Sequence, residues 1–152
     1  MGVAGCGKST IGEALAPVLS ARYIDGDRLH PPANIAKMSR GDPLQDADRW
    51  PWLDAVGAAL MENTVIGCSA LKRAYRDRIR KLAPDATFIY LSGDRAVIDA
   101  RMAARTGHFM PLSLLDSQFA ALEPPEADER AVVVSIDQPV TAVVAAIVKR
   151  LK

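Results

Sequence analysis

Apolar residues recur along this chain with two spacings, which separate the expected helices from the expected strands. The helical spacing of i, i+3, i+4, i+7 and i+8 first appears at Ile11, Ala14, Leu15, Val18 and Leu19. Pro17 falls inside this segment, so we expect it to kink or shorten the helix. Similar apolar faces predict further helices around residues 35–38, 48–62, 75–82, 94–105 and 140–151.

Short, uninterrupted apolar runs predict the strands. They cover residues 22–24, 64–68, 87–91 and 131–136, and each lies between two of the expected helices. Strands that are apolar on both faces and alternate with helices are typical of a parallel sheet covered by helices on both sides. The pattern therefore predicts an α/β protein.

Residues 2–9, GVAGCGKS, fit the pattern GxxxxGK[ST] of a phosphate-binding loop. Glycines in such a loop let consecutive backbone N–H groups converge on phosphates without Cβ clashes. Lys8 would reach the β- and γ-phosphates, and Ser9 would offer its hydroxyl to Mg²⁺. The helix that follows also turns its N-terminal dipole toward the anion. This motif predicts that the protein binds a nucleoside triphosphate.

Two junctions look too short for such a fold. A phosphate loop follows a strand, yet only Met1 stands before Gly2, so the first strand is missing from this chain or its start site is misplaced. The helix expected to end at Glu62 leaves only Asn63 before the next strand, where about two to six residues are usual. We expect residues to be absent at both points.

Composition and charge narrow the functional class. The chain has 152 residues, of which 49% are hydrophobic and 24% charged, as expected for one globular domain with a sizeable core. A net charge of +1 argues against a general nucleic-acid binder. No apolar run approaches the roughly 18–20 residues of a membrane span, and no signal peptide precedes the loop. Cys6 and Cys68 are too few for a disulfide framework or a zinc site, which favours a reducing cytoplasm.

Three polar clusters map to the edge at which parallel sheets bind ligands. Asp25 and Asp27 follow one strand, residues 68–72 follow the next, and residues 101–108 follow a later helix, where a lid would lie. Phosphoryl transfer needs a carboxylate that supports the metal, an oriented hydroxyl group and cations near the transferred group. The three clusters supply one of these each.

Several runs resemble those of the bacterial gluconokinase family and stand in the same order. They are residues 25–31 (DGDRLHP), 34–38 (NIAKM), 41–44 (GDPL), 48–53 (DRWPWL), 68–77 (CSALKRAYRD), 107–109 (GHF) and 126–130 (EADER). Many kinases share the phosphate loop, whereas the runs at 25–31 and 68–77 are far more specific. The chain departs from the family pattern in its absent first strand and at Cys6, Pro17 and Gly67.

The resemblance implies ATP- and Mg²⁺-dependent phosphorylation of D-gluconate at its 6-hydroxyl group, giving 6-phospho-D-gluconate for carbohydrate acid metabolism. It implies a three-layer α/β/α phosphate-loop kinase fold with a five-stranded parallel sheet, similar to the nucleoside monophosphate kinases. One kinase domain would cover residues 1–152, with a lid at about 101–122. The resemblance further implies a homodimer, whereas the composition and charge predict a cytoplasmic protein with neither nucleic-acid nor membrane partners.

The motifs and the resemblance together suggest a role for each site residue. The expected nucleotide-binding residues are Gly2, Val3, Ala4, Gly5, Cys6, Gly7, Lys8, Ser9, Thr10, Arg101 and Arg105. Ser9 and Asp25 are expected to serve the metal, Asp25 through a bound water. The expected catalytic residues are Lys8, Asp27, which would orient or deprotonate the 6-hydroxyl, and the lid residue Arg105. The expected gluconate-binding residues are Asp27, His30, Arg49, Lys72, Arg76 and His108, with the cations facing the gluconate carboxylate.

Two other functions fit parts of the pattern. Another small-hydroxyl kinase, such as shikimate kinase, would be expected to carry a glycine-rich run where this chain has residues 68–72. A nucleotide-binding regulator without catalysis would be expected to lack a strand-end carboxylate or the lid arginines. This chain has both kinds of residue, which argues against such a regulator: they are Asp25, Asp27, Arg101 and Arg105.

Overall fold

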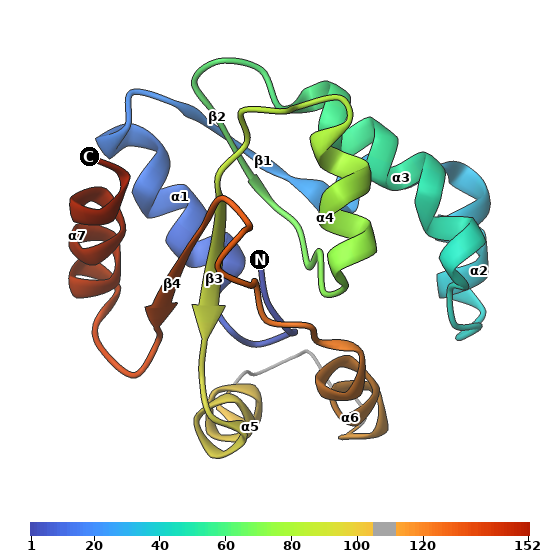
Figure 1. The fold of residues 1–152 in the computed structure, drawn as a ribbon. Coiled ribbons are helices and arrows are strands. Elements are labelled where there is room, and N and C mark those ends of the chain that lie inside the picture. The colour runs from blue at the N-terminus through green and yellow to red at the C-terminus, as the bar shows by residue number, and fades with distance from the viewer. Residues whose placement is uncertain (105–111) are drawn as a thin grey trace.

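The computed structural model describes residues 1–104 and 112–152 (Figure 1). Strands and helices alternate along the chain as the apolar pattern predicts. The elements are α1 (Lys8–Val18), β1 (Arg22–Asp25), the 3-10 helix η1 (Gly26–Leu29), α2 (Pro32–Ser39), α3 (Asp46–Ala59), β2 (Thr64–Gly67), α4 (Arg73–Arg80), β3 (Phe88–Ser92), α5 (Arg95–Ala103), α6 (Leu112–Ala121), β4 (Ala131–Ser135) and α7 (Val140–Leu151). The sequence pattern did not predict α6 as a helix.

The strands form two parallel pairs instead of one five-stranded sheet. β1 pairs with β2, with Arg22 opposite Thr64, and β3 pairs with β4, with Phe88 opposite Ala131. Within the described part of the chain, no strand joins β2 to β3. The parallel α/β architecture is confirmed, whereas the expected five-stranded sheet is not found in these residues.

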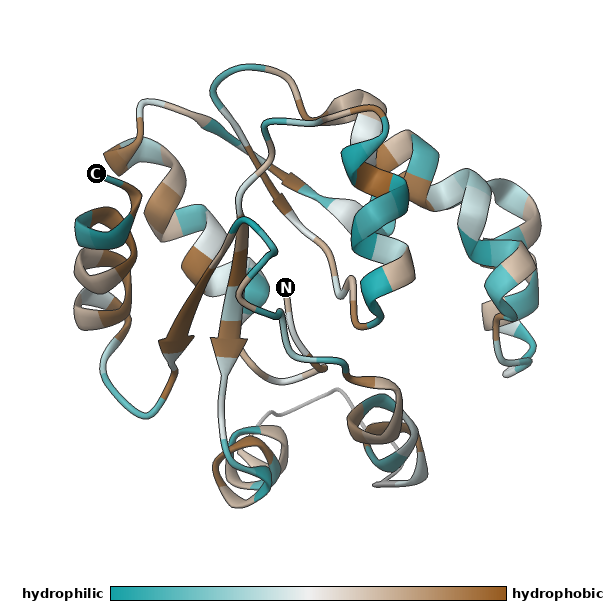
Figure 2. Cartoon of the chain, viewed as in Figure 1, coloured by the Kyte–Doolittle hydropathy of each residue, from teal (hydrophilic) through white to brown (hydrophobic). Residues whose placement is uncertain are grey.

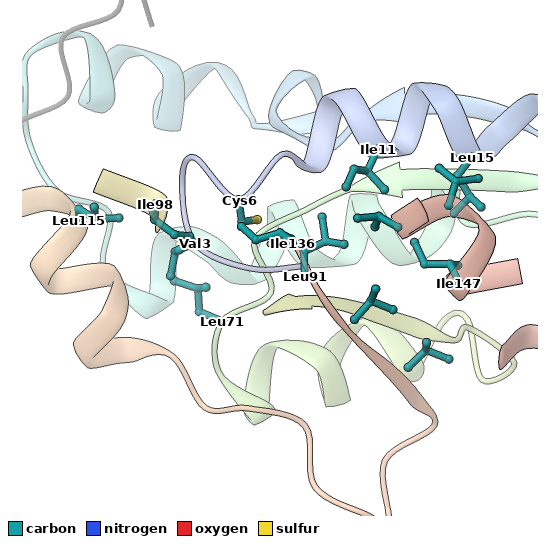
Figure 3. Close-up of a cluster of buried hydrophobic side chains, with 14 residues drawn as sticks. Val3, Cys6, Ile11, Leu15, Leu71, Leu91, Ile98, Leu115, Ile136 and Ile147 are labelled. Atoms are coloured by element: carbon teal, nitrogen blue, oxygen red, sulfur yellow. The ribbon is translucent and has the colours of Figure 1, made fainter. Parts of the chain in front are cut away.

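Two apolar clusters cover opposite faces of the strands. The larger lies beneath the phosphate loop and combines residues of α1, α5, α6 and α7 with residues of β3 and β4 (Figure 3). The smaller combines Trp52, Leu53 and Val56 of α3 with Tyr75 and Ile79 of α4. Figure 2 shows the hydrophobic colouring along β3 and β4 and on the helices beside them. Helices therefore pack against both faces of the strands.

Local geometry explains three features that looked unusual in the sequence. Pro17 lies in the last turn of α1, which ends at Val18. α3 ends at Ala59 and not at Glu62, so residues 60–63 form a connection of ordinary length before β2. A Cβ atom on Gly67 would overlap the hydroxyl group of Tyr23, which explains the glycine in that strand.

No helix among the described residues is both long and apolar enough to cross a membrane.

Candidate active site

The phosphate loop enters α1 through backbone geometry that suits an anion. Gly2, Gly5 and Gly7 have φ values of 140°, 80° and 94°, in the region that favours glycine. Gly7 is the N-cap of α1, and no side chain caps the helix there. The first-turn N–H groups of α1 therefore have no intrahelical acceptor and remain available to phosphate oxygens.

Lys8 folds over the loop that precedes it. Its ammonium group donates hydrogen bonds to the carbonyl oxygens of Gly2 at 3.1 Å and Val3 at 3.0 Å. Cys6 is fully buried beneath the loop, so its side chain packs while its backbone follows the loop (Figure 3). A cysteine in place of the usual serine is therefore compatible with this loop.

Arg101 of α5, an expected nucleotide-binding residue, lies beside the phosphate loop. A Cβ atom on Gly7 would lie 3.7 Å from Arg101 Nη1, and the guanidinium donates to the Ile136 carbonyl. A cavity of about 180 Å³ opens here, lined by Gly5, Gly7, Thr10, Ile11, Arg101, Gln138, Val140 and Val143. This cavity adjoins the phosphate loop on the side of α5 and α7.

Gln118 is a loop contact that the sequence analysis missed. Its Oε1 accepts a hydrogen bond of 2.6 Å from the backbone N–H of Ala4. On the same helix, Leu115 is almost completely buried in the cluster under the loop. α6, which lies in the expected lid region, is thus packed directly on the phosphate loop.

Asp25 and Asp27 lie together at the end of β1. Asp25 caps η1 by accepting a hydrogen bond of 3.0 Å from the Asp27 N–H, which leaves the Asp27 carboxylate exposed. A Cβ atom on Gly26 would lie 2.5 Å from the Gly67 carbonyl oxygen and 3.4 Å from Cys68 Cβ. Only glycine fits this close approach, which brings the two aspartates beside the turn that follows β2.

Trp52 of α3 contacts the backbone between Asp25 and Asp27. The indole N–H donates to the Gly26 carbonyl at 2.8 Å, and the indole ring stacks on His30 at 4.2 Å between centroids. Asn34 Nδ2 lies 3.2 Å from His30 Nδ1 and also donates to the Asp48 carbonyl at 2.8 Å. Because the Asn34 amide donates, His30 Nδ1 accepts and its proton lies on Nε2. Burial lowers the pKa of His30 and favours this neutral form.

Arg49 and Lys72 are brought together around Tyr75 and Asp46. Lys72 Nζ lies 3.2 Å from both carboxylate oxygens of Asp46, and the Tyr75 hydroxyl donates to the same carboxylate. Arg49 Nη1 donates to the Leu44 carbonyl at 2.6 Å and lies 3.9 Å from Asp46. The Tyr75 hydrogen bond, helped by Lys72, holds the pKa of Asp46 below its ordinary value. Two cations share one carboxylate, so the cluster keeps one net positive charge.

Arg76 is placed differently from our expectation. None of its side chain is exposed, and it forms two hydrogen bonds, of 2.6 and 2.7 Å, with the Glu129 carboxylate. Its Nη1 donates to the carbonyls of Ala70 and Leu71 at 3.1 Å. Because the guanidinium is buried and already bonded to a carboxylate and two backbone carbonyls, its position argues against direct substrate binding. Arg76 instead fixes the turn over residues 68–72 that carries Lys72.

The structure brings several of the expected site residues together, and their roles stay predictions. It brings the loop and Arg101 together, and it groups Arg49 with Lys72. Arg105 and His108 lie outside the described residues. Sequence reasoning missed Asp46 and Gln118 and gave no role to Glu129, since no motif shows which distant cation or N–H group each would contact.

Known proteins match this chain over almost its whole length. The family model described as shikimate kinase matches residues 4–150. Thermosensitive gluconokinase of Escherichia coli (strain K12) is 52% identical over 139 residues, covering 88% of this chain and 74% of that protein. Thermoresistant gluconokinase of the same strain is 48% identical over 159 residues, covering 100% and 91%. The crystal structure of a gluconokinase from Sinorhizobium meliloti 1021 matches with a TM-score of 0.90 and 49% identity, covering 99% and 90%.

Proposed function

We propose, because this chain belongs to the gluconokinase family of phosphate-loop kinases, that it transfers the γ-phosphoryl group of ATP to the 6-hydroxyl group of D-gluconate. The observation that carries this conclusion is the sequence identity of 48% to 52% with two gluconokinases, over 88% to 100% of the chain. The site supports it, since a nucleotide loop, a strand-end carboxylate and a cluster with net positive charge lie on described elements.

The phosphate end of the site fits ATP. The uncapped N-terminus of α1 and the three glycines provide the cradle, and Lys8 is long enough to leave its loop carbonyls for the β- and γ-phosphates. We place the nucleoside beside Arg101, in the cavity next to Gly7. An Mg²⁺ ion bound mainly by phosphates and water needs only one or two protein ligands. Ser9 would supply one such ligand, Asp25 would hold a metal-bound water, and bound Mg²⁺ would neutralise charge on the phosphates.

Asp27 is proposed to orient the 6-hydroxyl of gluconate and accept its proton as the new O–P bond forms. Its carboxylate is exposed at the end of β1, and its own N–H is held by Asp25, so the side chain stays free for the substrate. The Nε2–H of His30 is a donor suited to a neighbouring gluconate hydroxyl. Trp52 positions both residues without being assigned to the substrate itself.

The carboxylate of gluconate is proposed to bind at Arg49 and Lys72. These cations carry one more positive charge than Asp46 can balance, and the Tyr75 ring lies 5.8 Å from Arg49 Cζ and 5.4 Å from Lys72 Nζ. An incoming carboxylate would therefore complete the charge balance of the cluster. We also propose that Arg105 and His108 act from the lid and that the protein forms a homodimer.

A panel of acceptors tests this function. The release of ADP from Mg²⁺-ATP is measured with D-gluconate, with D-glucose, which has the terminal hydroxyl but no carboxylate, and with shikimate. We expect turnover with gluconate and a product phosphorylated at carbon 6 by ³¹P NMR. A kcat/KM for shikimate equal to or above that for gluconate would instead identify a shikimate kinase. ATP binding without transfer to any sugar acid would identify a regulator.

A further inference from the structure

Tyr23 of β1 carries a hydroxyl group that the proposed reaction does not use. It stands two positions before Asp25 in the strand, so the two side chains extend from the same face of β1. α1 packs against β1 and β2, and the Tyr23 ring lies against Gly12 of that helix. Because Ser9 precedes Gly12 by three residues, it lies on the same side of α1, one turn nearer the phosphate loop. Tyr23 therefore lies between the helix that carries Ser9 and the strand that carries Asp25.

Two glycines make room for this tyrosine. A Cβ atom on Gly12 would lie 2.3 Å from Tyr23 Cε2, and a Cβ atom on Gly67 would lie 2.4 Å from the Tyr23 hydroxyl oxygen. The two nearest ring carbons would lie 3.2 and 3.4 Å from that second Cβ, so the hydroxyl group is the part that most needs glycine at position 67. Gly67 stands opposite Asp25 in the parallel ladder. The hydroxyl group therefore lies at the end of the strands where the site is formed.

The Tyr23 hydroxyl is buried and lacks a hydrogen-bond partner within the described part of the chain. A buried polar group in this state is unfavourable, and most such groups in proteins are paired. Burial raises the pKa of the Tyr23 phenol, and the Ser9 hydroxyl opposes that rise as a neighbouring hydrogen-bonding group. The two hydroxyl groups are thus neighbours, although they are not aligned as a hydrogen bond in this structure.

The chemistry of Ser9 gives this hydroxyl group a use. A serine oxygen that donates a lone pair to Mg²⁺ keeps its own proton, and that O–H needs an acceptor. The Tyr23 oxygen has lone pairs to offer and is a neighbour of Ser9. Groups that orient a metal ligand in this way typically change metal affinity by about 10–100-fold. A phenylalanine would fill the same space beside Gly12 but would leave the Ser9 proton without this acceptor.

We propose that Tyr23 is a positioning residue of the Mg²⁺-nucleotide site, whose hydroxyl oxygen accepts the Ser9 O–H and thereby directs the Ser9 lone pair toward Mg²⁺. Tyr23 acts through Ser9 and is not a catalytic residue. The inference rests on the Mg²⁺-ATP part of the proposed function and is independent of which acceptor is phosphorylated.

Tyr23→Phe tests the proposal because it removes only the hydroxyl group. Calorimetry gives the Kd of ADP in the presence of Mg²⁺ and in the presence of EDTA, and thermal unfolding is followed without ligand. We expect the Kd with Mg²⁺ to rise about 10-fold and the Kd with EDTA to stay unchanged. Tm should not fall, because the variant loses a buried hydroxyl group that has no partner. Tyr90→Phe makes the same change on β3 and should leave both Kd values unchanged.

Gly67→Ala provides a second test of the same hydroxyl group. The new methyl group would overlap the Tyr23 hydroxyl, so the Kd of ADP with Mg²⁺ should rise in the parent chain. In the Tyr23→Phe chain the overlapping atom is gone, so the same substitution should add little to that Kd. Fully additive effects would overturn the placement of the hydroxyl group on which the proposal depends.

Other results would separate this role from simple packing. An unchanged Kd with Mg²⁺ in Tyr23→Phe would overturn the proposal. A lower Tm together with equal changes in both Kd values would also overturn it, because a packing residue affects the whole site without regard to the metal. If the parent chain itself binds ADP no better with Mg²⁺ than with EDTA, the metal part of the proposed function fails, and this inference fails with it.

Discussion

The phosphate-loop region and the acceptor region of this protein are built for binding in different ways. In the loop, backbone N–H groups and glycine conformations form the cradle, and Lys8 is the main charged side chain. In the acceptor region, side chains from α3, the turn at residues 68–72 and α4 gather around Asp46. The first region occupies eight consecutive residues, whereas the second depends on contacts between segments far apart in the chain.

Because of this difference, we expect amino-acid substitutions in the two regions to have different effects. A loop made of backbone tolerates Cys6 in place of serine but depends on its glycines and on one lysine. The acceptor cluster holds its cations through internal partners, so a substrate carboxylate must bind groups that already have contacts. We therefore expect loop variants to lose the chemical step and acceptor variants to lose substrate affinity or the support beneath the cluster.

Replacement of Lys8 with alanine should break the loop region most severely. The variant loses the cation that stabilises charge on the transferred phosphoryl group, so kcat should fall by roughly 10³-fold or more. ADP release with gluconate measures this loss, and thermal unfolding should stay near that of the parent chain. Lys149→Ala, in the exposed last turn of α7, is the matched control. Near-normal turnover by the Lys8 variant would contradict the assignment of the loop.

Arg76→Met tests the support beneath the acceptor region. The change leaves the Glu129 carboxylate buried without its main partner, so the free energy of unfolding should fall by about 3–5 kcal/mol. Denaturant unfolding measures the loss, and the double variant with Glu129→Leu should recover part of it. An unchanged midpoint for Arg76→Met would contradict the structural role.

The same pair gives a dependence on pH. The Arg76 hydrogen bonds, joined by the Glu126 N–H, lower the folded pKa of Glu129 from its ordinary 4.5 to about 2. A carboxyl group with a lowered folded pKa stabilises the protein above its unfolded pKa. This contribution is therefore present above pH 4.5 and is lost as the pH falls toward 2, and the double variant should lack it.

Asp27→Asn should separate chemistry from binding in the acceptor region. The amide keeps the shape but cannot take the hydroxyl proton, so turnover should fall by roughly 10²-fold while calorimetry still detects Mg²⁺-ATP and weaker gluconate binding. Asp25→Asn keeps an oxygen acceptor for the Asp27 N–H and should instead raise the Mg²⁺ requirement. Normal turnover by Asp27→Asn together with an inactive Asp25→Asn would show that the two assigned roles are reversed.

Lys72→Met should have the smallest effect and should test the cluster around Asp46. Loss of one cation should raise the KM for gluconate by about 10-fold, with little change in kcat, because the carboxylate lies far from the transferred group. Lys81→Met, just beyond α4, serves as the control. A fall in kcat at unchanged KM would show that Lys72 acts on the chemical step instead.

The sequence by itself determined the local features of this protein. Apolar spacing predicted the four strands and the α-helices other than α6, because burial of a helix face or of a two-faced strand imposes a pattern on the chain. The phosphate loop was readable because its work is done by consecutive backbone groups and their glycines. The positions of Asp25 and Asp27 were also readable, since Asp25 ends β1 and Asp27 lies in the turn of η1 that follows.

The tertiary structure decided which partner each charged side chain has. Arg76 and Lys72 stand four residues apart in one motif, yet Arg76 turns inward to Glu129 while Lys72 reaches Asp46. Asp46 and Gln118 gained roles only through contacts with residues 26 and 114 positions away in the chain. The spacing of residues along a helix gives the direction of a side chain, but its partner depends on which distant segment packs opposite, and only the fold sets that.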